Sequence, residues 1–420
     1  MDRTDAHGAR SKEPNDRKDP GPAKAPAGGA RIALGRPSIT DDEVAAAARV
    51  LRSGWLVHGP ECRAFEEELA AACGRRYAAV VSSGTAALHL ALWAFATEGG
   101  AGERGDGERG GGEGLELLVP AFTFPATANV SRFLDRPAQV RLCDVDADTF
   151  CVRDETLAAW LAARRGPALV VHQFGHPAGG AELGSGPDGA AAERLILSDA
   201  ACAIGTREAM RGRAVCLSFH PRKVLTTGEG GAVLSDDEGL IEEVRARRAH
   251  GLVFSAGAEV AALPAAGLNY RLPEVSAAIG RIQLRRLPSL RARHRALAER
   301  YREQLVAAGL RVQADAPGRT WQALTLELPA GTDRPALRRA LSERGIETQI
   351  ASYALHRLAA WRDASVFTPA GLLTSGPGGP AALPVADRLH DRGLALPLHA
   401  ELTDAEVDTV TSTLRALLGR

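Results

Sequence analysis

The sequence predicts an α/β protein with a mostly parallel sheet that helices cover on both faces. Two observations support this fold class. Short apolar runs recur along the chain, and most are four or five residues long, as in strands buried on both faces. Helical patterns separate several of them, which indicates crossover connections between parallel strands. The runs are Ala78–Val81, Leu115–Val119, Ala168–Val171, Leu195–Leu197, Ala214–Leu217 and Ala232–Leu234.

Capping signals mark helices near both ends of the chain. Thr40 and Glu43 fit a capping box, which predicts a helix running toward Arg52. Thr403 and Glu406 fit a second capping box. The further helices expected from periodicity cover residues 64–73, 86–96, 288–310, 334–344 and 403–418.

The length of 420 residues is enough for two domains. Residues 1–30 are charged and rich in Gly and Pro, without an aromatic residue, which predicts a disordered tail. We expect a large domain over residues 31–285 and a smaller C-terminal α+β domain over residues 286–420, with a strand at residues 321–328. Surface loops lengthened by insertion are expected at residues 99–114 and 178–190, and a shorter Gly/Pro loop at residues 375–380.

Composition argues against several functional classes. Lys+Arg and Asp+Glu both number 51, so a strongly basic nucleic-acid-binding surface is not expected, nor is a polybasic membrane anchor. No apolar run reaches membrane-spanning length, and the N-terminus lacks a secretory apolar stretch. The six cysteines are scattered without a Cys-x-x-Cys pair, which favours a reducing cytoplasm over a disulfide framework or a structural zinc site.

Three polar sites follow predicted strands, where ligands bind in open α/β sheets. In Ser82–Ala87 a helix begins directly after a strand, so free backbone N–H groups and the Thr85 hydroxyl could hold a phosphate; a capped helix without ligand is the simpler alternative. Asp199 ends another strand, as either a structural or a functional acid. Lys223 follows a third strand within Ser218–Lys223, although a lone lysine is usually a surface charge.

Together the three sites fit one cofactor. A lysine amine can form a Schiff base with pyridoxal 5'-phosphate, so Lys223 is the candidate for that bond. A carboxylate such as Asp199 can keep the pyridine nitrogen protonated. The helix start near Gly84 can receive the phosphate. His172 and His176 are spaced like a metal pair, but no Glu motif accompanies them, so no metal is expected.

The chain resembles the DegT-type (DegT/DnrJ/StrS) family of pyridoxal-phosphate-dependent sugar aminotransferases, which have the aspartate-aminotransferase fold (fold type I). The resemblance runs from about Gly35 to the C-terminus, and it rests on seven ordered segments rather than on one motif. The segments are Ser53–Pro60, Ser82–His89, Val119–Asn129, Asp199–Ala201, Ser218–Lys223, Thr226–Gly231 and Gly267–Arg271.

The resemblance implies a role for each matching residue. Lys223 matches the Schiff-base lysine and Asp199 the acid at the pyridine nitrogen, while Phe124 matches an aromatic residue that stacks on the cofactor ring. Asn269 matches a residue that reaches the phosphate from the neighbouring subunit, which implies a homodimer. The cofactor-binding set implied is Gly84, Thr85, Phe124, Asp199, Cys202, Ser218, Lys223 and Asn269.

Other positions are tied to the substrates or depart from the family pattern. Trp55 and His58 lie in a segment that lines the substrate side in the family. Arg222 and Arg271 are candidates for gripping a donor carboxylate, although at least one of them is expected to be an ordinary surface arginine. Cys202 stands where the family usually has Gln or His, which weakens one expected hydrogen bond to the cofactor.

The resemblance implies a ping-pong transamination. L-Glutamate or L-glutamine would donate nitrogen to a keto-sugar acceptor, expected to be nucleotide-linked, in sugar or natural-product biosynthesis. Dehydratase members of the family have histidine at the lysine position, so Lys223 favours the aminotransferase branch. The alternatives are a cyclitol-ketone aminotransferase, an enzyme like aminohydroxybenzoate synthase, and a regulatory protein that binds the cofactor without turnover.

Overall fold

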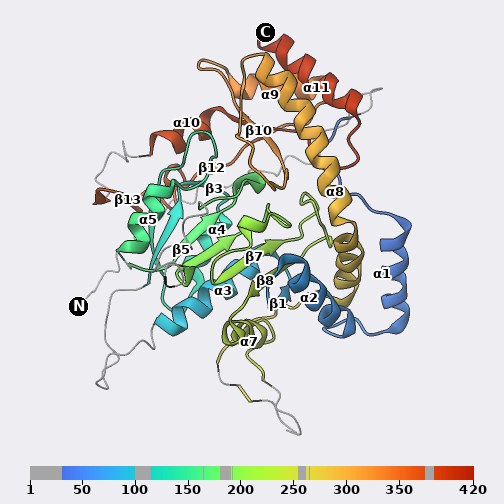
Figure 1. The fold of residues 1–420 in the computed structure, drawn as a ribbon, viewed down its shortest axis with the longest axis vertical. Coiled ribbons are helices and arrows are strands. Elements are labelled where there is room, and N and C mark those ends of the chain that lie inside the picture. The colour runs from blue at the N-terminus through green and yellow to red at the C-terminus, as the bar shows by residue number, and fades with distance from the viewer. Residues whose placement is uncertain are drawn as a thin grey trace, which may run out of the picture.

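The computed structural model describes most of the chain (Figure 1). The predicted tail at residues 1–30 and the loop at residues 375–380 lie outside the described residues, as do most of the loops at residues 99–114 and 178–190. The described residues are 31–99, 115–163, 165–179, 191, 193–253, 262–263, 265–373 and 383–420.

A nine-stranded sheet in the order β1-β8-β7-β6-β5-β2-β4-β13-β14 forms the centre of the molecule. The strands from β7 through β13 in this order pair in parallel, and β8 and β14 pair antiparallel with their neighbours. The predicted, mostly parallel sheet is therefore confirmed. The strands are β1 (Tyr77–Val81), β2 (Glu116–Pro120), β4 (Gln139–Cys143), β5 (Ala168–Val171), β6 (Ile196–Asp199), β7 (Ala214–Ser218), β8 (Gly231–Ser235), β13 (Ser365–Thr368) and β14 (Gly371–Leu373).

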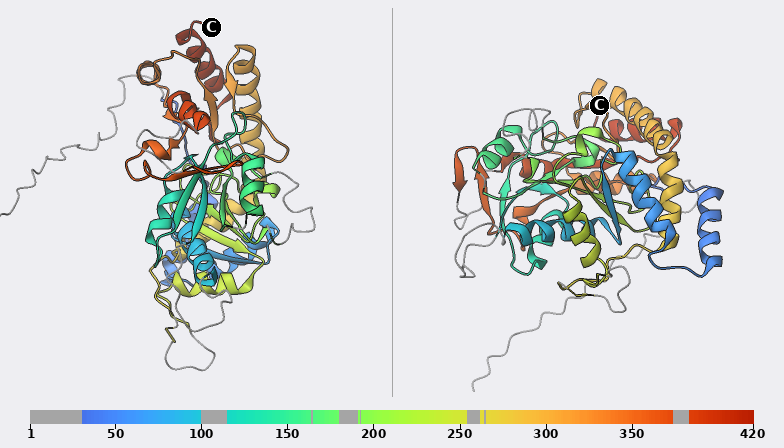
Figure 2. Two further views of the ribbon diagram at one scale, coloured as in Figure 1. Left: turned by 90° about the vertical axis from the view of Figure 1, so that its left-hand side faces the viewer. Right: turned by 60° about the horizontal axis from the view of Figure 1, so that its bottom comes forward.

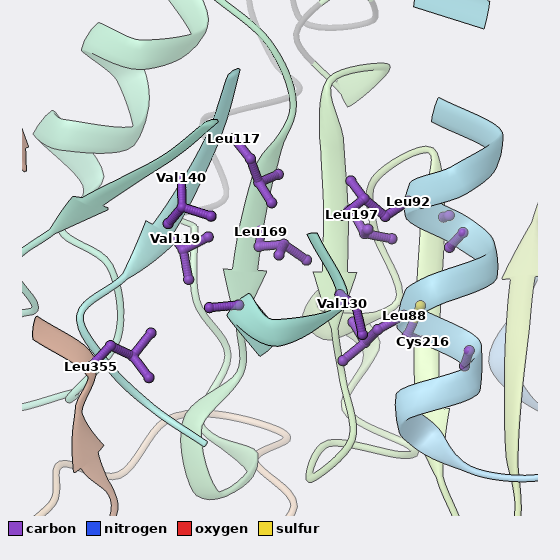
Figure 3. Close-up of a cluster of buried hydrophobic side chains, with 14 of the residues drawn as sticks. Leu88, Leu92, Leu117, Val119, Val130, Val140, Leu169, Leu197, Cys216 and Leu355 are labelled. Carbon is purple, nitrogen blue, oxygen red and sulfur yellow. The ribbon is translucent and has the colours of Figure 1, made fainter. Parts of the chain in front are cut away.

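Helices cover both faces of this sheet. On one face, Leu88 and Leu92 of α3 (Gly84–Gly99) pack toward Leu197 of β6 and Cys216 of β7 (Figure 3). The next residue of β7, Leu217, lies in a separate cluster with residues of α2 (Pro60–Cys73) on the other face. This alternation explains the continuous apolar runs of the strands, since each side chain has a helix to pack against. The helices α5 (Asp154–Ala162) and α7 (Glu238–Arg247) complete the two layers.

The long helix α8 (Glu274–Ala307) differs from its predicted range of 288–310. The prediction took Pro288 as a helix start, but the structure has it in the helix interior. The turns before Pro288 contact α1 (Asp41–Ser53) and α2, and this packing offsets the backbone hydrogen bond that proline cannot make. Helix α2 also begins four residues earlier than predicted, with Pro60 in its first turn.

The C-terminal part of the chain forms a second sheet in the order β11-β15-β10-β9, which is antiparallel. Figure 1 shows α8 running from beside α1 and α2 to this sheet, α9 and α11, and both views in Figure 2 agree. The elements are β9 (Arg311–Val312), β10 (Leu324–Glu327), α9 (Arg334–Glu343), β11 (Gln349–Ile350), α10 (Pro384–Arg392), β15 (Gly393–Leu396) and α11 (Asp404–Leu417).

The two parts of the chain are interleaved. Strands β13 and β14 come from the C-terminal third yet extend the large sheet. Strand β12 (Tyr353–Ala354) pairs with β3 (Phe122–Thr123) in a separate two-stranded sheet, so a C-terminal segment reaches the residues that follow β2. The division at residue 285, which falls inside α8, stays a prediction. Over the described ranges, no helix is both long enough and apolar enough to span a bilayer.

Candidate active site

A cavity of about 700 Å³ lies at the carboxyl ends of the parallel strands. It brings together segments that are far apart in sequence, including the start of α3, the ends of β6 and β7, and the C-terminal residues around β12. The predicted site residues that line it are Gly84, Thr85, Phe124, Asp199, Cys202, Ser218, Arg222 and Lys223. Those outside it in the single chain are Trp55, His58, Asn269 and Arg271.

Lys223 brings a half-buried amine into this cavity. The chain turns after β7, and the Lys223 N–H donates to the His220 carbonyl at 2.8 Å, which fixes the backbone that carries the lysine. Nζ donates a hydrogen bond to Cys202 Sγ at 3.0 Å. Lys223 is the only lysine after residue 30, since the other three stand at positions 12, 18 and 24. Any covalent attachment through a lysine between residues 31 and 420 must therefore use Lys223.

Asp199 ends β6 and is 6% exposed. Its carboxylate accepts hydrogen bonds from Thr127 Oγ1 at 2.8 Å and from the Ala201 N–H at 3.2 Å. Burial raises the pKa of Asp199, while these two bonds and the charge of Lys223 oppose that rise. The carboxylate thus retains unused acceptor capacity and has no ion-pair partner among the described residues. A protonated ring nitrogen is the kind of group that would complete it.

The start of α3 makes close contact with the end of β7. A Cβ on Gly84 would lie 2.7 Å from Ser218 Cβ, so a side chain there would block this approach. The helix begins two residues after β1, and Gly84, Thr85 and Ser218 line the cavity. The Ala86 N–H donates to Ser83 Oγ at 3.1 Å, while the N–H groups of Gly84 and Thr85 lie in the first turn, where no intrahelical acceptor is available. Such a helix start attracts phosphate through N–H donors and the helix dipole. The residues present therefore fit the phosphate of the cofactor.

An aromatic pair forms another part of the wall. Phe124 is 60% exposed, and its ring centroid lies 6.3 Å from that of Tyr353 with the planes tilted by 64°. Tyr353 is brought here by the pairing of β12 with β3. Tyr353 was not among the predicted site residues, because nothing in the sequence near residue 353 signals a contact with residue 124. Thr127 had no predicted role either, although it lies in the matching segment Val119–Asn129 and its hydroxyl donates to Asp199.

The two arginine candidates occupy different places. Arg222 is exposed at the cavity wall, and its carbonyl accepts a hydrogen bond from Gln322 Nε2 at 2.9 Å. Arg271 lies beside β1 through a backbone bridge to Val81 and does not line the cavity. Within one chain, Arg222 is thus the arginine placed to meet a ligand.

The remaining predicted residues lie along neighbouring segments of the surface. Trp55 is 58% exposed, and its Nε1 donates to the Val57 carbonyl at 3.1 Å. His58 Nε2 lies 3.1 Å from Arg248 Nη2, and burial together with the charge of Arg248 lowers the pKa of His58. Asn269 forms a backbone bridge with Ala249.

The histidine pair considered for metal binding has other partners. His172 Nδ1 accepts the Ala178 N–H at 3.0 Å, and His176 Nδ1 lies 2.7 Å from the Pro177 carbonyl. Burial lowers the pKa of His172 to about 3 and that of His176 to about 4. In the ranges that the structure describes, no three His, Cys, Asp or Glu side chains gather as metal ligands.

Comparison with known proteins places this chain in a family. The model of the DegT/DnrJ/EryC1/StrS aminotransferase family matches residues 37–415. The aminotransferase TlmJ from Streptoalloteichus hindustanus is 29% identical with a TM-score of 0.75, and the match covers 92% of this chain and 99% of that chain. DesI, solved in the presence of its TDP-sugar product, is 28% identical with a TM-score of 0.75 and 94% of each chain covered.

The sugar aminotransferase CalS13 from Micromonospora echinospora is 26% identical with a TM-score of 0.73, and the match covers 92% of this chain and 99% of that chain. The order of motifs and the fold agree with this match, and Lys223, Asp199 and the start of α3 line one cavity. The chain therefore belongs to the DegT/DnrJ/EryC1/StrS aminotransferase family and is a fold type I aminotransferase that depends on pyridoxal 5'-phosphate.

Proposed function

We propose that this aminotransferase moves an amino group from L-glutamate or L-glutamine to the ketone of a nucleotide-linked sugar. The supporting observation is that Lys223, Asp199 and the proposed phosphate-binding residues Gly84 and Ser218 line one cavity of about 700 Å³. That volume is within the range of small-molecule sites and leaves room beyond the cofactor. Among similar chains, DesI was solved with a TDP-sugar product and CalS13 is named a sugar aminotransferase.

Each residue of the site has a task in this proposal. Pyridoxal 5'-phosphate supplies the aldehyde and the electron-withdrawing ring that let nitrogen pass between two substrates. Asp199 would hold the ring nitrogen protonated, and the start of α3 with Ser218 would hold the phosphate. Lys223 would anchor the cofactor, and its free Nζ would move a proton to and from the reacting substrate carbon.

We further propose that Arg222 binds a carboxylate of the amino-acid donor. It is exposed at the cavity wall next to Lys223 in the chain, and a guanidinium matches a carboxylate geometrically. Arg222→Gln should raise the KM for glutamate about tenfold or more with little change in the KM for the acceptor. An equal rise in both constants would contradict this assignment.

A homodimer with shared sites is the proposed assembly. Trp55, Leu56 and Val57 are 58%, 43% and 58% exposed, which is unusual for adjacent apolar residues and suits a contact surface. In a dimer, Asn269 of one subunit would serve the cofactor phosphate of the other. Mixing Lys223→Ala with Asn269→Ala subunits should then restore activity, because one of the two sites in a hybrid dimer keeps both residues. Two variants whose changes both lie in the part of the site that one subunit supplies, such as Lys223→Ala and Asp199→Asn, should not complement.

The decisive experiment is an absorption spectrum of the protein with pyridoxal 5'-phosphate before and after L-glutamate or L-glutamine. Borohydride reduction followed by peptide mapping should place the cofactor on Lys223, because no other lysine follows residue 30. A donor should convert the spectrum to the aminated form, and Lys223→Ala should show no such change. If the parent binds cofactor but no donor alters its spectrum, the proposed donors are wrong.

A further inference from the structure

The Lys223 amine makes a contact that the sequence did not predict. Its hydrogen bond to Cys202 Sγ, 3.0 Å long, is the one that Nζ forms within the described part of the chain. Asp199 acts on the amine through its charge rather than through a hydrogen bond. Within the described residues, the sulfur of Cys202 is thus the protein atom to which the amine donates its hydrogen bond.

Cys202 differs in its surroundings from the other cysteines. Of the six, Cys202 alone lines the cavity. Four of the others are buried, and Cys73 is half-buried on α2, outside the cavity. Cys73 therefore offers a matched control, since it is also partly accessible but contacts no part of the site.

The turn that carries Cys202 is held in place from two sides. Asp199 Oδ1 accepts the N–H of the preceding residue, Ala201, and the Ala203 N–H donates to the Ala200 carbonyl at 2.9 Å. Gly175 also packs against this turn, where an added Cβ would lie 2.8 Å from the Cys202 carbonyl oxygen. Because this backbone is fixed, only rotation of the Cys202 side chain can move the sulfur relative to Asp199.

We propose that Cys202 is the positioning residue of Lys223. The Cys202 sulfur holds Nζ where the amine meets the aldehyde of the cofactor, and it stays beside Nζ once the cofactor is held. The proposal rests on the cofactor chemistry assigned above. A lysine side chain has many rotamers, so one fixed contact reduces the orientations that must be searched. A thiol makes only weak hydrogen bonds, so it can orient the amine without preventing its reaction.

The first test follows cofactor capture rather than turnover. Cofactor-free protein is mixed with pyridoxal 5'-phosphate, and the rise of the bound-cofactor absorption is timed. Cys202→Ala should capture it about fivefold more slowly, the effect of one lost hydrogen bond. Cys202→Ser should stay near the parent rate because a hydroxyl also accepts from Nζ, and Cys73→Ala should match the parent. Equal rates for Cys202→Ala and the parent, or a Cys202→Ser as slow as Cys202→Ala, would overturn the proposal.

The second test measures accessibility of the thiol itself. Iodoacetamide labelling of the parent, read by peptide mass spectrometry, should fall several-fold at Cys202 when the cofactor is bound and stay constant at Cys73. Unchanged labelling of Cys202 would remove it from the neighbourhood of the attached cofactor and contradict the proposal. Neither test needs a donor or an acceptor, so a wrong substrate assignment would leave both results intact.

Discussion

Two buried carboxylates, Glu43 and Asp199, differ in how many hydrogen bonds they accept and in the direction in which folding shifts their pKa. Glu43 is 2% exposed and accepts hydrogen bonds from Thr40, Gln283 and Arg286. Although burial alone would raise its pKa, these donors lower the pKa of Glu43 to about 2. Asp199 is 6% exposed and accepts hydrogen bonds from only one hydroxyl and one N–H, and burial raises its pKa.

The difference separates a structural acid from a functional one. Glu43 joins the start of α1 to α8 with its oxygens saturated, which is how a buried charge stabilises a fold. Asp199 is left with free acceptor capacity at the cavity, which costs stability until a ligand completes it. A buried carboxylate that accepts fewer hydrogen bonds than it could is therefore a better sign of a ligand site than burial alone.

The largest effect is expected for Asp199→Asn. Removing the charge that faces the ring nitrogen should weaken cofactor binding by about 100-fold and reduce turnover at least as much. The cofactor-free variant should be no less stable than the parent at neutral pH. A group whose pKa is raised by folding costs stability in its charged form, and this cost grows as pH rises above the unfolded pKa, 3.8 for an aspartate.

Cofactor titration and thermal melting of the cofactor-free proteins measure these two quantities separately. A variant that melts well below the parent but keeps its cofactor would make Asp199 a structural acid like Glu43. That result would abolish the distinction between the two carboxylates.

The opposite pattern is expected for Glu43→Gln. Because folding lowers the pKa of Glu43 from 4.5 to about 2, its charge contributes stability above pH 4.5. The variant should lose on the order of 3 kcal/mol of unfolding free energy at pH 7. The loss should shrink as pH falls from 4.5 toward 2, and turnover per folded molecule should stay near the parent value.

Urea unfolding at pH 7 and at pH 3.5 checks this pH dependence. The exposed Glu67 on α2 provides the control, and Glu67→Gln should change the stability by less than about 0.5 kcal/mol. A Glu43→Gln deficit that is equal at both pH values would assign the loss to shape rather than to charge.

The sequence predicted the parts of the site that depend on local pattern. Asp199 ends a strand and Lys223 follows one, and both strands are visible as apolar runs because both faces of the sheet are covered. The expected segments converge in one cavity. Strand β4 was missed because Gln139 and Arg141 alternate with apolar residues, so no run is visible. Tyr353 was missed because its place depends on a pairing between distant segments.

The smallest effect is expected from removing a single hydrogen bond to Asp199, which tests how far its donors set it apart from Glu43. Thr127→Val removes the donor to Asp199 Oδ2 at nearly constant volume and should weaken cofactor binding about fivefold. Thr127 also lies 3.1 Å from Thr123 Oγ1, so Thr123→Val tests whether that second contact matters and should change binding less than twofold.

A double-mutant cycle then locates the effect of Thr127. If the hydroxyl acts only through the carboxylate, Thr127→Val should cost little in an Asp199→Asn background, because the charge that strengthens the bond is already gone. Cofactor affinities of the four proteins, measured by absorption, give the coupling. Additive losses in cofactor affinity would mean that Thr127 shapes the cavity independently of Asp199. The number of hydrogen bonds that Asp199 accepts would then not be what sets the affinity for the cofactor.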